Sequence, residues 1–145
     1  MDKSDVALIQ SSFEAVKPIS EEAGELFYGR LFEIAPEVKP LFKGDMQEQG
    51  RKLMATLAYV VNGLADLAQV LPAASALAKR HVDYGVKPNH YIPVGAALPW
   101  TLEQGLGPKW APETAVAWAK AYTTLSSFMI AEAYGPPPPR NEASR

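Results

Sequence analysis

The sequence predicts an all-α fold in which helices pack around a single core. Apolar residues recur at steps of three and four along most of the chain, the spacing that places side chains on one face of a helix. Proline, glycine and short polar clusters separate these segments, and no segment alternates as a strand would. A chain of 145 residues suits one such domain and is too short for a second catalytic one.

The first two helices are predicted over residues 2–17 and 20–34. Pro18 ends the first helix because a proline lacks the N–H that an interior helical position needs. Ser20 is a good N-cap for the second, since acidic residues follow it in the first turn. The stripe of the first helix consists of Val6, Ile9, Phe13 and Val16.

A short third helix and a long fourth one follow. Pro36 can begin a helix over residues 36–42 because proline is tolerated at the first helical position. Asp45, followed three residues later by Glu48, resembles a capping box and predicts a helix over 45–65.

The central part of the chain predicts two more helices. Pro72 can start a helix that ends between residues 81 and 84, before a glycine. Asn89 can cap a helix over 89–106, in which Pro99 is expected to cause a kink.

The last predicted helix opens at Pro112 and stops at Gly135. Four prolines and a polar stretch follow, so residues 136–145 are predicted to form an extended, mobile and disordered tail beyond a domain of residues 1–135.

Composition excludes several classes of protein. A formal net charge of -2 offers no broad basic field for nucleic acid or for an anionic membrane. The absence of cysteine excludes disulfides, thiolate metal sites and covalent haem attachment. The most apolar region, residues 53–77, is interrupted by polar residues and proline too soon for a membrane span, and no export signal is visible. We therefore expect a cytoplasmic protein that binds neither nucleic acid nor a membrane.

His81 is the first candidate functional residue. It continues an apolar helix face that also carries Ala74, Leu77 and Ala78. A neutral imidazole on such a face suits a haem iron, because a ring nitrogen can bind the metal while alkyl groups exclude water. An ordinary core or capping histidine would give the same pattern.

Two polar side chains could face the same pocket. Gln49 begins an otherwise apolar stripe, and Tyr28 lies on a helix with an apolar inner face. Each could donate a hydrogen bond to a bound gas, although a solvated amide and a core tyrosine are the simpler alternatives. Gly24 and Gly50 lie inside predicted helices, where glycine costs up to about 1 kcal/mol relative to alanine. Close contact between the two helices would explain both glycines and would bring both donors together.

Short motifs with compatible spacing extend from near the start of the chain to about Tyr134. They are, in chain order, Phe27-Tyr28-x-Arg30-Leu31-Phe32, Pro36-Glu37-Val38-x-Pro40-Leu41-Phe42, Gln49, Lys79-Arg80-His81, His90-Tyr91 and Trp118-x-Lys120-Ala121-Tyr122. Each motif is short, but the ordered combination resembles bacterial single-domain haemoglobins, which are globins similar to the haem domain of flavohaemoglobins.

The resemblance implies a globin fold with its helices packed around one non-covalently bound haem b (iron protoporphyrin IX). It implies that His81 is the proximal iron ligand and that Phe42 packs against the haem. Tyr28, Gln49 and Leu53 would form the distal pocket.

The resemblance also implies a proximal-side role for Tyr91. Leu77 shares the apolar face of His81 and is expected to contact the cofactor. Lys52 and Arg51 could reach the haem propionates, with solvated surface positions as the alternative. His90, the other histidine, is not expected to bind iron.

One departure from the flavohaemoglobin pattern concerns the last helix. The relatives use a glutamate there in a proximal relay, but the matching position is Ala133, with Glu132 one residue earlier. One residue turns a helical side chain by about 100°, so Glu132 is not expected to reach His81, and a peroxidase-like proximal side is in doubt.

These observations favour reversible binding of oxygen, with carbon monoxide and nitric oxide as further ligands. The competing hypothesis is nitric oxide dioxygenation with an external reductase, since the chain has no flavin or nicotinamide segment. Gas or redox sensing is a third, weaker hypothesis. A helical interaction module without haem would show the same periodicity, but His81 together with Phe42 argues against it.

Overall fold

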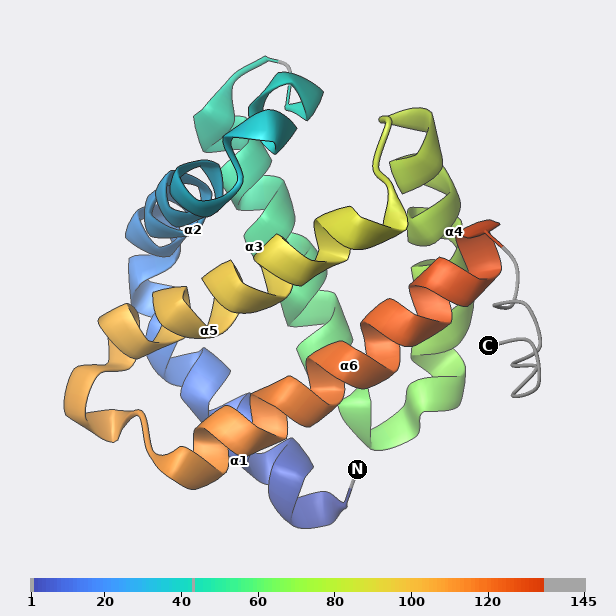
Figure 1. Ribbon diagram of the computed structural model, residues 1–145. Helices are drawn as coiled ribbons and strands as arrows, with labels where there is room; N and C mark the ends of the chain where they lie inside the picture. The colour runs from blue at the N-terminus through green and yellow to red at the C-terminus, as the bar shows by residue number, and fades with distance from the viewer. Residues whose placement is uncertain (1, 43, 135–145) are drawn as a thin grey trace, which may run out of the picture.

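Residues 2–42 and 44–134 are described by the computed structural model, and within these ranges the chain forms only helices and their connections (Figure 1). The all-α prediction is therefore confirmed. The predicted tail, residues 136–145, lies outside the described residues. The α-helices are α1 (Lys3–Val16), α2 (Ser20–Ile34), α3 (Met46–Asn62), α4 (Leu67–Asp83), α5 (Tyr91–Leu106) and α6 (Pro112–Tyr134). Short 3-10 turns are η1 (Lys17–Ile19), η2 (Pro36–Leu41), η3 (Leu64–Asp66), η4 (Pro88–His90) and η5 (Gly107–Lys109).

The helices pack in two crossing groups (Figure 1). Helix α2 packs against α3 and α5, while α6 packs against α1 and α4. The stripe predicted on α1 faces inward, and its last three members are buried in the core. The most completely buried large side chains are Phe13, Ile9, Leu31, Val16 and Val70.

The predicted starts of α2, α3 and α6 are confirmed, but the predicted N-cap role of Ser20 is wrong. Asp45 caps α3 through a hydrogen bond from the N–H of Gln47 at 2.9 Å, and Pro112 begins α6. Ser20 is the first residue of α2 rather than its cap, because its hydroxyl donates instead to the carbonyl of Lys17.

The boundaries of the central helices also differ from the prediction. Helix α4 begins at Leu67, so Pro72 lies inside it. The N–H that this proline lacks would have bonded to the first turn, at Ala68, where the chain is exposed to water. Helix α3 ends at Asn62, before η3.

Two further predictions fail at short turns. The predicted third helix is the 3-10 segment Pro36–Leu41. Asn89 does not cap α5, because it lies inside η4, where the ring of His90 accepts a hydrogen bond from the N–H of Lys87 at 2.9 Å.

No single helix in the described ranges is long and apolar enough to cross a bilayer. The stretches Met46–Asn62 and Leu64–Asp83 reach the required length and composition only when taken together, and they are bent by 50° relative to each other.

Candidate cofactor site

Helices α3 and α4 form the two walls of the candidate site. Within the described residues, α4 packs closely on α6 and α3 packs closely on α2, but α3 and α4 are not a closely packed pair. A cavity of about 260 Å³ lies between them and is closed at one side by α6. Its apolar lining includes Val60, Val70, Ala74, Leu77, Leu125 and Met129. Of the predicted site residues, Leu77 lines this cavity, and His81 follows one turn later on the same helix.

His81 is half-buried on α4, one turn beyond Leu77. Its Nδ1 atom lies 2.8 Å from the main-chain oxygen of Leu77. A carbonyl can only accept, so Nδ1 carries the proton and Nε2 is left as the nitrogen available to a metal. Burial lowers the pKa of His81 and the charge of Arg80 lowers it further, against the opposing effect of the Leu77 hydrogen bond. His81 is therefore presented as a neutral imidazole, the form that binds iron.

Aromatic rings surround His81 on the side of α5. The ring of Tyr91 stacks on the imidazole with centroids 6.3 Å apart and planes inclined by 23°. Tyr84 packs at 6.1 Å, a contact that the sequence analysis missed although Tyr84 lies one turn beyond the histidine. The hydroxyl of Tyr122 donates a hydrogen bond to the main-chain oxygen of Tyr91 and so helps to fix the position of Tyr91.

The hydroxyl of Tyr91 is buried without a hydrogen-bond partner among the described groups. Burial raises the pKa of this phenol, and the nearby Tyr134 raises it further. A buried polar group without a partner costs about 1–3 kcal/mol, so this position holds unused hydrogen-bonding capacity beside the histidine.

An aromatic cluster lies on the α2 side of the molecule. Tyr28 is 8% exposed and packs against Phe42 at 5.1 Å and against Phe32 at 5.9 Å between ring centroids. Phe42, which the sequence predicts to pack against the cofactor, is half-buried in this cluster. The turn η2 thus places Phe42 next to Tyr28.

The backbones of α2 and α3 touch where two glycines meet, as the sequence predicts. A Cβ atom added to Gly24 would lie 3.1 Å from the Cα of Gly50, so side chains are excluded from this crossing. The contact brings the Tyr28 hydroxyl to 3.4 Å from the main-chain oxygen of Gln49. Burial raises the pKa of Tyr28 to about 12, so the hydroxyl keeps its proton near neutral pH and can only be a neutral donor or acceptor.

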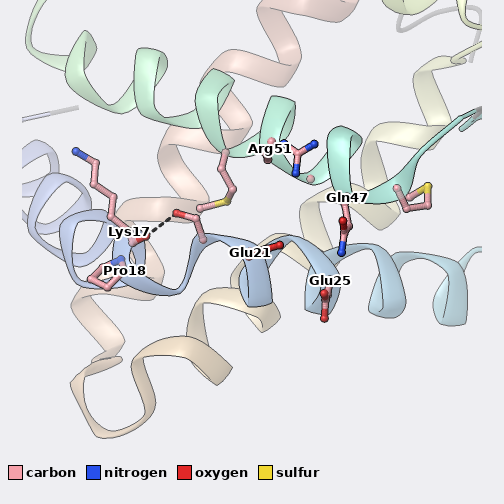
Figure 2. A pocket seen from close by; sticks show the side chains of 10 residues that line it. Lys17, Pro18, Glu21, Glu25, Gln47 and Arg51 are labelled. Carbon is pink, nitrogen blue, oxygen red and sulfur yellow. Dashed lines mark hydrogen bonds between the residues drawn. The ribbon is translucent and has the colours of Figure 1, made fainter.

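The remaining predicted residues of α3 lie on different faces. Leu53 is half-buried against the core. Lys52 is exposed and pairs with Glu48 at 3.8 Å. Arg51 lines a separate hollow of about 350 Å³ between α2 and α3, which Figure 2 shows together with the acidic Glu21 and Glu25. Arg51 therefore faces α2 rather than the α3–α4 cavity.

The carboxylate of Glu132 contacts α4 at a residue other than His81. It accepts a hydrogen bond from the hydroxyl of Ser75 at 2.7 Å. The Nδ1 proton of His81 is held by Leu77 instead. The expectation that Glu132 does not reach His81 agrees with this geometry.

The side-chain chemistry of the site suits an iron porphyrin. It supplies one neutral imidazole with a free Nε2, an apolar space between two helices, and a protonated tyrosine on the neighbouring crossing. A haem needs one protein ligand on the iron and an apolar surround that excludes water. Fold and side-chain chemistry together are those of a helical protein suited to hold a haem.

Comparison with known proteins agrees with the helical fold and with a haem cofactor. The globin family profile matches residues 25–129, and the chain belongs to the globin family. Flavohaemoproteins of Bordetella parapertussis and Bordetella bronchiseptica are each 31% identical over 129 residues, which cover 84% of this chain and 32% of theirs. The chain therefore spans about a third of the length of these relatives. It is related to their haem domain, and haem is the cofactor that the family implies.

Two solved structures share the fold. The bacterial globin of Campylobacter jejuni has a TM-score of 0.80 and 28% identity, and the match covers 92% of this chain and 96% of that one. An engineered carbene transferase derived from a putative nitric oxide dioxygenase of Rhodothermus marinus has a TM-score of 0.83 and 23% identity, with 92% and 94% covered.

Proposed function

We propose that this globin binds one haem b through His81 and converts nitric oxide to nitrate with oxygen, using an electron from an external reductase. The observation that carries the proposal is the hydrogen bond between Nδ1 of His81 and the main-chain oxygen of Leu77, a residue that lines the α3–α4 cavity. It fixes the tautomer of the ring, with the proton on Nδ1 and Nε2 free, while burial keeps the imidazole neutral. When bound, the haem supplies the iron on which oxygen, carbon monoxide and nitric oxide can bind.

The distal side is formed by Tyr28, Gln49 and Leu53 in this proposal. At 3.4 Å the hydrogen bond from Tyr28 to the Gln49 carbonyl is longer than a strong O–H···O bond, so little energy holds the hydroxyl there. Tyr28 can therefore turn its proton toward a bound gas, and Leu53 keeps the pocket apolar. Tyr91, Leu77 and Phe42 complete the contacts with the cofactor, and Lys52 is the basic residue proposed near the propionates.

One similarity supports nitric oxide as the substrate. A protein with the same fold is described as a putative nitric oxide dioxygenase. The reaction is balanced when one molecule each of oxygen and nitric oxide combine with one electron to give one nitrate ion. The electron is the part of the reaction that a reductase must supply.

Reversible oxygen binding is the second candidate, and the proximal side favours it. The partner of His81 is a neutral carbonyl, while the carboxylate of Glu132 is bonded to Ser75. A charged partner would make the imidazole a stronger electron donor to iron than a carbonyl does. The site is therefore suited to holding oxygen without breaking its O–O bond.

The number of catalytic turnovers distinguishes nitric oxide dioxygenation from reversible oxygen binding. The haem-loaded protein is supplied with oxygen, nitric oxide, NADH and a flavin reductase, and nitrate is counted per haem. Many equivalents of nitrate support dioxygenation, whereas a single equivalent followed by arrest favours oxygen binding. Visible spectra of the ferric, reduced, oxygen and carbon monoxide forms establish haem binding first. His81→Ala should lose or alter the Soret band, and a colourless wild type that takes up no added haem would reject both functions.

A further inference from the structure

Helix α4, which carries His81, is held mainly by α6. The two helices pack closely, and the C-terminal part of α6 lies against α4 (Figure 1). Two polar contacts join α6 to α4 and to the segment just beyond it. Ser75 donates to Glu132 at 2.7 Å, and the hydroxyl of Tyr134 donates to the carbonyl of Val86 just beyond α4. Helix α3 does not pack closely on α4, and the cavity lined by α3, α4 and α6 lies between them, so the position of α4 depends mainly on its contact with α6.

The Ser75–Glu132 contact is distant from the imidazole itself. Ser75 precedes His81 by six residues, which corresponds to about 9 Å along the helix and about 120° of rotation. The Nδ1 proton of His81 is already bonded to Leu77. Any influence of Glu132 on the iron ligand must therefore pass through the position of α4.

We propose that Ser75 and Glu132 are positioning residues for haem retention, acting as a brace between α4 and α6 that holds His81 at the cofactor. The proposal rests on the haem site proposed above. It assigns Glu132 a mechanical role and no electronic one, since what the brace requires is a hydrogen-bond acceptor and not a charge.

The charge-neutral variant distinguishes these roles. Glu132→Ala and Ser75→Ala remove the hydrogen bond, whereas Glu132→Gln keeps an acceptor oxygen and loses the charge. A hydrogen bond worth up to about 1 kcal/mol predicts haem transfer to an excess of apomyoglobin about two- to five-fold faster in both alanine variants. Glu132→Gln should transfer haem at the wild-type rate. The double alanine variant should be no faster than either single one, because both remove the same contact.

Resonance Raman spectra of the ferrous proteins give the second measurement. The iron–histidine stretching frequency should be the same in the wild type, Glu132→Gln and Glu132→Ala. Glu103→Ala, which removes an exposed carboxylate on α5, is the matched control for haem transfer. Alanine variants at Ser75 and Glu132 that behave like Glu103→Ala would overturn the brace, as would a frequency shift in Glu132→Gln. A wild type that binds no haem would instead overturn the proposed function itself.

Discussion

The Nδ1 atom of His81 lies 2.8 Å from the main-chain oxygen of Leu77, one helical turn earlier on the same helix. The backbone of α4 thus orients the imidazole of His81, the predicted iron ligand on the same helix. Residues 77 and 81 stand four apart, the spacing at which helical neighbours face each other. The tautomer of the histidine therefore follows from local helix geometry.

A pH dependence of stability follows from the burial of His81. Burial lowers the pKa of His81 in the folded protein, whereas the unfolded chain has a pKa of about 6.5. As the pH falls through about 6.5, His81 takes up a proton in the unfolded state but not in the folded state, so the free energy of unfolding decreases. The decrease ends once the pH has also fallen below the lowered pKa of the folded state. Urea unfolding of the haem-free protein between about pH 8 and pH 5 measures this. His81→Leu should show a weaker dependence, and equal slopes would contradict the assignment.

Removing the Tyr28 hydroxyl should speed the release of oxygen. Tyr28→Phe keeps the ring against Phe32 and Phe42 but loses the donor. A net hydrogen bond of about 1 kcal/mol predicts an oxygen dissociation rate about five-fold higher, measured by stopped-flow mixing with carbon monoxide. Gln49→Leu should act in the same direction, and unchanged rates in both distal variants would reject this arrangement.

The glycine crossing of α2 and α3 should tolerate no added methyl group. Gly24→Ala would place a Cβ 3.1 Å from the backbone of Gly50, and forcing the helices apart is expected to cost about 1–3 kcal/mol of unfolding free energy. Gly29→Ala lies in the same helix with nothing within 4 Å, so it should be neutral or stabilising by up to about 1 kcal/mol. Urea titration compares the two. Equal changes in unfolding free energy for the two variants would mean that Gly24 and Gly50 are farther apart than the structure shows.

Tyr91 and the tyrosine that donates to its carbonyl, Tyr122, should respond in opposite ways when the hydroxyl is removed. Tyr91→Phe removes a buried hydroxyl without a partner among the described groups, so the free energy of unfolding of the haem-free protein should stay equal or rise by about 1 kcal/mol. Tyr122→Phe removes the donor to the Tyr91 carbonyl and should lower it by about 1 kcal/mol. Thermal unfolding of both variants provides the measurement. A loss of stability in Tyr91→Phe would show that its hydroxyl has a partner in solution.

Helix boundaries show where local sequence is a poor guide. Ser20 and Asn89 have the chemistry of N-caps, but the hydroxyl of Ser20 finds the Lys17 carbonyl and Asn89 lies within a 3-10 turn. Pro72 has the chemistry of a helix start, yet α4 begins five residues earlier. Several arrangements of a turn have similar local energies, and packing of the neighbouring helices selects among them.

The sequence by itself determined the helical class, the order of the main helices, the close approach of Gly24 to Gly50 and the apolar face that carries His81. These features depend on side-chain periodicity and on glycine, which are properties of the chain alone. Only the tertiary structure decided that Leu77 holds the His81 proton, that Arg51 faces α2 and that Glu132 binds Ser75. Each of these depends on side-chain rotamers and on how far one helix is displaced along another. A shift of one residue turns a side chain by about 100°, so partners across helices are determined only once the helices have packed.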